Sequence, residues 1–292
     1  MLPISDFKKD TLPKEYRHNS LVSLVQNISI LTGRLNIDYV SDKRPEKYPD
    51  SDDPYPLYDK SKKGAHDSRF ATGIVVGVEK NTDTDALCYC FDCRSQGSTT
   101  TKKWGKVYLL TTKTVIFDKS EALKTKFTLF FDNKTRVLSG SSVKDSDINY
   151  DWCEVECATC DTTLIDKLSD NLERCSTEMK SVNSHFIGEL TRPKLAIIVF
   201  HPFKQPKTFS YGFWKDRFEG NKNTWTNYEY NVGTERGAAG AFVYIVGVSD
   251  ISKRYVHVHC GLRNHGGYSS FGLERTNDAS NINDNRGPRV DN

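Results

Sequence analysis

The chain has 292 residues, of which 37% are hydrophobic and 11% aromatic, so it can bury one large core or two small ones. Forty-one basic and 38 acidic residues leave a formal net charge of +3, which is too balanced for the electrostatic footprint of a nucleic-acid-binding protein. The first residues lack a secretory signal, and no apolar run approaches the roughly 18 to 20 residues of a membrane helix. We therefore expect a cytoplasmic protein with neither nucleic acid nor membrane as a partner.

The N-terminal segment predicts a small helix and a strand. Apolar residues recur at helical spacing within residues 16 to 29, at Leu21, Leu24, Val25 and Ile28. A strand-like run covers residues 31 to 40. The segment from 41 to 64 is rich in Pro, Asp and Lys, which predicts a surface loop without regular structure. We expect residues 1 to 68 to form an N-terminal extension.

Beyond residue 69, short β-branched and aromatic runs alternate with polar loops. These runs are FATGIVVGV, WGKVYLLTTKTVIFD, KFTLFFD, LAIIVFHP, TFSYGFW, GAFVYIVGV and RYVHVHCGL. Their spacing is typical of an antiparallel barrel or sandwich. TTLIDKLSDNLERC predicts a strand end that leads into a short helix, and polar residues 276 to 292 predict a disordered tail.

Four of these segments occur in the order FATGIVVGV, VYLLTTKTVIFD, CDTTLIDKL and GTERGAAGAFVY, and YVHVHCGL follows them. Together they resemble the chymotrypsin/trypsin-like serine peptidases (PA clan), in which His, Asp and Ser follow one another on separate loops. The chain also resembles uncharacterised invertebrate members of that family, with their cysteine-rich insertion and HPF-like turn. The resemblance implies a mainly β fold of two antiparallel six-stranded β-barrels, with a peptidase-like domain over residues 69 to 275.

The resemblance also implies a degenerate catalytic site. Thr114 stands where the family's Thr-Ala-x-His turn has its histidine, and Asp161 takes the place of the orienting aspartate. Ala239 stands where the family has serine in Gly-x-Ser-Gly. The amides of Gly237 and Ala239 then correspond to the oxyanion hole. His66, His185 and His201 are the other candidates for the base.

A specificity pocket is expected beside these positions. The resemblance places Gly233 at its base and His259 and Gly261 on its wall. His259 is similar to the histidine with which glutamyl endopeptidases and viral main proteases read Glu or Gln. Cys260 lies between the two wall residues, and we expect it to be a buried thiol rather than a displaced nucleophile.

A methyl group cannot attack an amide, and a threonine hydroxyl is too weak a base near neutral pH. We therefore expect a catalytically inactive serine peptidase homologue that binds an extended peptide or a protein partner. One alternative is an active serine endopeptidase that carries a serine-to-alanine change. Another is a zinc-stabilised interaction scaffold that is unrelated to peptidases, and a third is an unrelated β-sandwich.

Two cysteine-rich segments, CYCFDC and CEVECATC, suggest a metal site. The pairs Cys90 with Cys93 and Cys157 with Cys160 have the Cys-x-x-Cys spacing that tetrahedral zinc requires, with Cys88 and Cys153 as further candidates. Four sulfur ligands leave no position for a reacting water, so such a site is structural. The resemblance places it beside the substrate cleft. Disulfides and free thiols remain the alternatives.

Overall fold

The structure of the protein is a computed structural model. It describes residues 1–49, 51–59, 61–81, 83, 86–95, 97, 103–130, 135–186, 194–220, 224–263 and 266–274. The predicted disordered tail lies outside these ranges.

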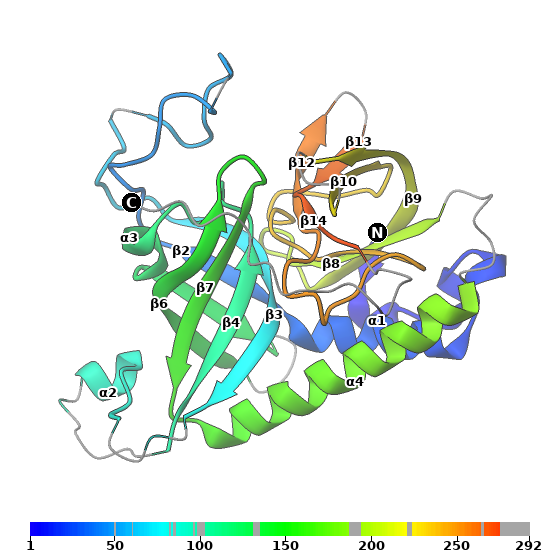
Figure 1. The fold of residues 1–292 in the computed structure, drawn as a ribbon, viewed down its shortest axis with the longest axis horizontal. Helices are drawn as coiled ribbons and strands as arrows, with labels where there is room; N and C mark the ends of the chain where they lie inside the picture. Colours follow the sequence, from blue (N-terminus) through cyan, green and yellow to red (C-terminus); the bar gives the residue numbers. More distant parts are fainter. Residues whose placement is uncertain are drawn as a thin grey trace.

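Six antiparallel strands close into a barrel in the order β2-β3-β4-β7-β6-β5 (Figure 1). The strands are β2 (Thr32–Ile37), β3 (Arg69–Lys80), β4 (Gly105–Thr111), β5 (Thr125–Leu129), β6 (Arg136–Asp147) and β7 (Trp152–Thr159). The strand β2, which the sequence analysis assigned to the N-terminal extension, closes the barrel by pairing with both β3 and β5. The chain is thus a mainly β protein, as predicted from its strand pattern.

The second β unit is an eight-stranded sheet whose main path is β11-β8-β9-β10-β13-β12. Its strands are β8 (Leu195–Phe200), β9 (Thr208–Glu219), β10 (Trp225–Tyr230), β11 (Val243–Ile245), β12 (His259–Arg263) and β13 (Gly266–Ser269), with β1 (Leu2–Pro3) beside β9 and β14 (Gly272–Leu273) beside β10. One of the two predicted barrels is thus closed, and within the described residues the second β unit is a sheet that does not close.

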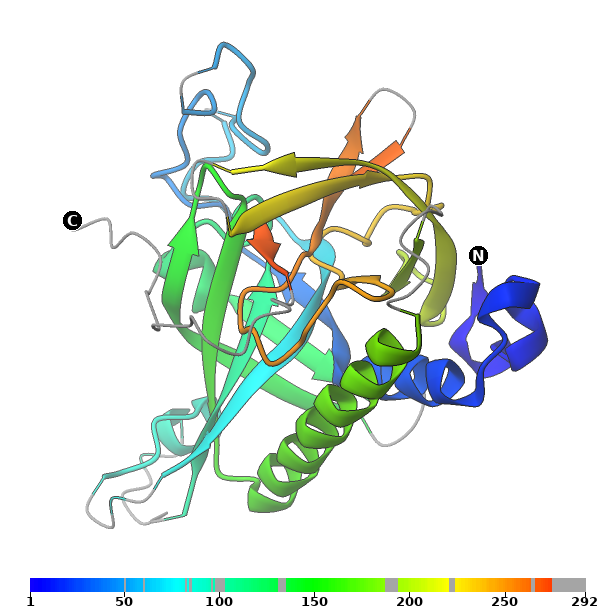
Figure 2. The same cartoon turned by 45° about the vertical axis from the view of Figure 1, so that its right-hand side comes forward.

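The two ends of the second sheet nevertheless come together. Phe242 and Val258 form a single bridge, and the amide of Val243 donates to the carbonyl of His257 at 2.9 Å. No full ladder forms, because the chain just before β11 turns through Gly237 and Gly240, both of which have positive φ. The sheet therefore curls into an incomplete barrel beside the closed one (Figure 2).

Two helices pack along the β units. The helix α1 (Asn19–Leu31) contacts β2 of the barrel and β8 of the second sheet, and its four predicted core residues are buried. The helix α4 (Thr162–Phe186) has 25 residues, longer than the short helix predicted, because its buried positions keep helical spacing as far as Phe186. Figures 1 and 2 show α4 running along the barrel toward α1.

The remaining helical elements are short. They are α2 (Phe91–Ser95), α3 (Lys119–Ala122) and three 3-10 turns at Ile4–Asp6, Lys9–Thr11 and Lys14–Tyr16. Among the described residues, no helix combines the length and apolarity needed to cross a membrane.

Candidate functional site

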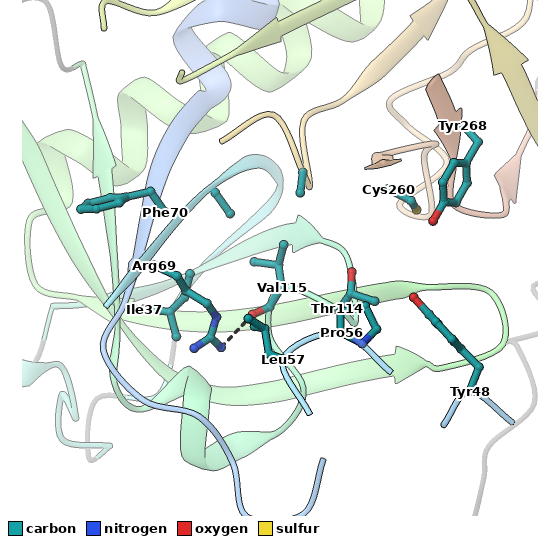
Figure 3. A pocket seen from close by; sticks show the side chains of 12 residues that line it. Ile37, Tyr48, Pro56, Leu57, Arg69, Phe70, Thr114, Val115, Cys260 and Tyr268 are labelled. Carbon is teal, nitrogen blue, oxygen red and sulfur yellow. Dashed lines mark hydrogen bonds between the residues drawn. The ribbon is translucent and has the colours of Figure 1, made fainter. Parts of the chain in front are cut away.

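A pocket of about 240 Å³ lies between the barrel and the second sheet. It is lined by Ile37, Tyr48, Pro56, Leu57, Arg69, Phe70, Ala71, Thr114, Val115, Ala239, Cys260 and Tyr268. Figure 3 shows Cys260 and Tyr268, from the second sheet, across from Thr114 and Tyr48. Two residues predicted from distant parts of the sequence, Thr114 and Ala239, thus line the same pocket.

Thr114 lies in the tight turn that follows β4. The amide of Val115 donates to the carbonyl of Thr112 at 3.1 Å, and the two threonine hydroxyls, Thr112 Oγ1 and Thr114 Oγ1, are 2.9 Å apart. The carbonyl of Thr114 accepts a hydrogen bond from Arg44 Nη2 at 3.1 Å. These bonds fix the backbone of Thr114 at the rim of the pocket.

Asp161, the predicted orienting aspartate, does not line the pocket. Its carboxylate accepts a hydrogen bond from the amide of Leu164 at 2.9 Å, in the first turn of α4, and pairs with Arg136 at 3.2 Å. An aspartate at this position caps free amides at the helix N-terminus. The structure therefore gives Asp161 a helix-capping role, at the other end of β7 from Thr114.

The aspartate that contacts Thr114 is Asp151, which sequence reasoning missed. Its carboxylate accepts hydrogen bonds from the amide of Thr114 at 2.9 Å and from its hydroxyl at 3.4 Å, and it also bonds the thiol of Cys260. Asp151 directly precedes the buried strand β7. In the peptidases that the sequence resembles, the orienting aspartate begins a strand with the pattern Asp-Ile-x-Leu-Leu-x-Leu. The strand after Asp151 departs from that pattern because Glu154 occupies one of its apolar positions.

Burial raises the pKa of Asp151 to about 6, although the hydrogen bonds from Thr114 and Cys260 oppose this shift. Between pH 4 and 6 the folded protein then holds a proton that the unfolded chain has released. The resulting stability is fully present below pH 4 and is lost as the pH rises through 6.

We compare the free energy of unfolding of the parent with that of Asp151→Asn. The parent value minus the variant value is expected to fall by about 2 kcal/mol as the pH rises from 4 to 7. The full shift would give about 3 kcal/mol, and part of it is already lost at pH 4, because the carboxyl of the unfolded chain has a pKa of 3.8. Urea titrations of both proteins at several pH values measure the difference. Parallel pH profiles would contradict the raised pKa.

The glycines on either side of Ala239 are required by packing. Gly237 has φ of +107° and Gly240 of +83°. A Cβ at Gly237 would lie 2.3 Å from the carbonyl oxygen of His201, and one at Gly240 would lie 2.0 Å from Thr111 Oγ1. The loop is thereby pressed against the barrel, where the amide of Thr72 donates to the carbonyl of Ala239 at 2.9 Å. The glycine frame thus has a structural role that does not depend on a nucleophile.

The predicted specificity residues do not line the pocket themselves. His259 is buried, its Nδ1 lies 2.8 Å from the hydroxyl of Tyr230, and burial lowers its pKa to about 4, so the ring is neutral near pH 7. Gly233 lies close to Met1 and Ser210. Cys260, expected to be buried, is instead partly exposed to the pocket, because the β12–β13 register shifts between His259 and Gly261.

None of the three alternative histidines lines the pocket. His66 Nδ1 lies 3.0 Å from the carbonyl oxygen of Asp38, and the ring of His185 stacks on that of His18 at 4.5 Å. His201 is 1% exposed, and burial lowers its pKa to about 3. Among the described residues, the pocket lining contains no histidine.

A buried ion network anchors the loop that walls the pocket. Glu121 accepts hydrogen bonds from Arg44 Nε at 2.7 Å and from Arg69 Nη2 at 2.6 Å, and the side chains of Arg44 and Glu121 are fully buried. Arg44 also donates to the carbonyl of Pro56 at 3.1 Å. The loop predicted to be irregular is irregular, but this network holds its residues Pro56 and Leu57 against the pocket.

Four cysteines converge at the opposite end of the barrel. The Sγ atoms of Cys88, Cys90, Cys93 and Cys160, here called the four-cysteine cluster, all lie within 4.8 Å of one another. This arrangement can hold a metal ion. The predicted ligand set is corrected accordingly, because Cys157 and Cys153 point into the main core of the barrel and Cys88 completes the cluster.

The resemblance implied a metal site beside the substrate cleft. The four-cysteine cluster instead lies away from the pocket. Strand β4 starts next to Trp104, which packs with the cluster, and ends before Thr114. Strand β7 starts after Asp151 and ends before Cys160. The cluster and the pocket thus lie at opposite ends of the same two strands.

No family model matches the sequence, and no curated protein matches it. Solved structures that resemble the chain include the HtrA-type protease AlgW with a decapeptide (10% identity, TM-score 0.40, covering 86% of this chain and 62% of that one). A serine-to-alanine variant of AlgW was solved with a decapeptide (9%, 0.42, 85% and 62%) and with a tripeptide (9%, 0.40, 85% and 58%). The chain spans less than two thirds of the length of these proteins. The mainly β fold class follows from the strand pairing of this chain and not from these similarities.

Proposed function

We propose that the protein is a catalytically inactive homologue of serine peptidases that binds an extended peptide, or an extended segment of a protein partner, in the pocket between its two β units. The observation that carries this proposal is the placement of Thr114 and Ala239 in one pocket, with the Asp151 carboxylate bonded to Thr114. These positions match the order His, Asp, Ser along the chain, with the first and last replaced.

The chemistry of the lining residues supports binding without hydrolysis. Ala239 offers no nucleophilic atom, and in the part of the chain that the structure describes no histidine lines the pocket to act as a base. The Cys260 thiol also lines the pocket, where it donates hydrogen bonds to the Val258 carbonyl at 3.7 Å and to the Asp151 carboxylate. In cysteine peptidases a histidine activates the thiol, and the described lining of the pocket supplies none.

The strand β12 supplies an edge for an extended ligand. It is the last strand on the main path of the second sheet. His259 at its start exchanges backbone hydrogen bonds with Gly240 and Ala241, so the open edge lies further along, where Leu262 is 70% exposed. An extended peptide can add to such an edge through backbone hydrogen bonds. Within the described residues the amide of Ala239, which lines the pocket, donates no hydrogen bond and can meet a ligand carbonyl, whereas Gly237 is buried and does not line the pocket.

Peptides selected from a random display library test this proposal. We expect Ala239→Phe to weaken the binding of a selected peptide at least tenfold, because the new ring fills the pocket of about 240 Å³. Isothermal titration measures the change. Val137→Phe, on the exposed outer surface of the barrel, is the matched control and leaves the affinity unchanged. Equal affinities for the parent and Ala239→Phe would contradict binding at this pocket.

A second part of the proposal concerns which side chain of the bound peptide is preferred at its first position. We propose from the sequence resemblance that His259, with Gly233 and Gly261, favours Glu or Gln at the first position of the ligand. The ring is buried beside Tyr230, so a local shift must expose it before the neutral imidazole donates to a side-chain oxygen. The same titrations measure the affinities of variants of the selected peptide with Glu, Gln, Lys or Leu at that position. Equal affinities for all four peptides would contradict the proposed preference for Glu or Gln.

A further inference from the structure

The four-cysteine cluster brings together two segments that are far apart in the sequence. Cys88, Cys90 and Cys93 lie in the connection from β3 to β4, where Cys93 belongs to α2. Cys160 lies between the end of β7 and the start of α4. Their sulfur atoms meet within 4.8 Å although some 70 residues separate the two segments. The cluster therefore joins a long connection to the body of the barrel.

The distances fit one tetrahedral ion. With metal–sulfur bonds of about 2.3 Å, the sulfur atoms of a Cys₄ zinc site lie about 3.8 Å apart. Cys90 Sγ and Cys160 Sγ are 4.0 Å apart. The amide of Cys90 points at Cys88 Sγ and that of Cys93 points at Cys90 Sγ, both at 3.5 Å. Amide donors of this kind stabilise the thiolate form that a metal requires.

The residues around the four-cysteine cluster form a small core that a bound metal ion would stabilise. The connection between β3 and β4 has its own small apolar cluster, separate from the main core, which contains Cys88, Cys90, Cys93, Trp104 and Ala158. Its regular structure within the described residues is limited to the five residues of α2. A core this small contributes little stability without a cross-link or a metal.

We propose that Cys88, Cys90, Cys93 and Cys160 bind one zinc ion that fixes the β3–β4 connection to the junction of β7 and α4. Thiolate ligands select zinc over the hard cations, and the four sulfurs leave no open coordination position, so the ion takes no part in catalysis. The site lies away from the peptide pocket, so this inference is independent of the proposed function.

Elemental analysis of the full chain, purified under reducing conditions without added metal or chelator, tests the site. We expect about one equivalent of zinc per chain. We expect less than a tenth of an equivalent in Cys93→Ala and in Cys160→Ala. Cys157→Ala and Cys175→Ala are the matched controls, since both thiols are buried outside the cluster, and both are expected to retain the zinc.

A second measurement on the parent protein covers the case in which a ligand variant fails to fold. X-ray absorption at the zinc edge is expected to show four sulfur neighbours at about 2.3 Å and no nitrogen or oxygen neighbour. A parent with less than a tenth of an equivalent of zinc would overturn the proposal. So would disulfides among these four cysteines after alkylation and mass spectrometry, stoichiometric iron in place of zinc, or loss of zinc in Cys157→Ala but not in Cys160→Ala.

Discussion

Ala239→Ser alone is expected to leave the protein unreactive toward a fluorophosphonate probe, whereas Ala239→Ser combined with Thr114→His is expected to give labelling at least tenfold above background. A serine without a base stays protonated, and in subtilisin the loss of either the serine or the histidine costs roughly a millionfold in turnover. The amide of residue 114 already donates to Asp151, so a histidine there starts beside an orienting carboxylate. Gel fluorescence of the labelled protein measures the result.

Two aspartates provide the control for this experiment. In the double variant, Asp151→Asn is expected to reduce labelling strongly, since the matching change in trypsin lowers turnover by about 10⁴-fold. Asp161→Asn is expected to leave labelling unchanged, because Asp161 caps α4 and pairs with Arg136. Labelling of Ala239→Ser by itself would instead support an active peptidase with a single replaced residue. Labelling that depends on Asp161 rather than Asp151 would contradict the site described here.

Glu121→Gln is expected to destabilise the protein by about 3 to 5 kcal/mol, because it leaves two guanidinium groups without their buried counter-charge. Glu121 is fully buried and accepts from Arg44, Arg69 and the amides of Ser41 and Phe117. The same change releases the loop from the pocket, since Arg44 holds the Pro56 carbonyl. Urea unfolding followed by circular dichroism measures the loss.

An exposed ion pair provides the matched control. Lys80 and Asp166 are 2.6 Å apart, with side chains 63% and 58% exposed. Asp166→Asn is expected to change the free energy of unfolding by less than about 1 kcal/mol, because water and salt screen such pairs. If Glu121→Gln cost no more than this control, the network would not anchor the loop in the way described.

Much of the fold follows from local patterns in the sequence. Strands such as β3, β4 and β8 are dense in β-branched and apolar residues, and α1 has one apolar face at helical spacing, so these elements were predicted. Barrel closure was not predictable in this way. It depends on pairing β2 with β5, about 90 residues away, and no local pattern specifies such a pairing.

The candidate site was predictable only in part. Thr114 and Ala239 could be located because turn and glycine signals mark their positions. Asp151 was missed, because the strand after it carries the buried Glu154, which pairs with Arg254 at 2.6 Å and breaks the apolar pattern. The sequence favours Asp161 instead because TLIDKL has the apolar content of a strand, although these residues lie in the first two turns of α4.

The cysteine ligands show a similar limit. Cys-x-x-Cys spacing indicates a metal site only when both thiols point the same way. In β7, Cys157 points into the barrel, while Cys160 lies just beyond the last paired residue, Thr159, and is free to turn toward Cys90. The alternation of a strand and the point at which it ends thus decide the ligand set, and the sequence does not mark that end.

The central claim is that an extended peptide binds between the two β units, along β12 and over Ala239. A crystal structure of the chain with a display-selected peptide tests it most directly. We predict a peptide that pairs with the exposed part of the β12 edge and directs one backbone carbonyl at the amide of Ala239. A peptide bound elsewhere on the molecule, with the pocket beside Thr114 and Ala239 empty, would contradict it.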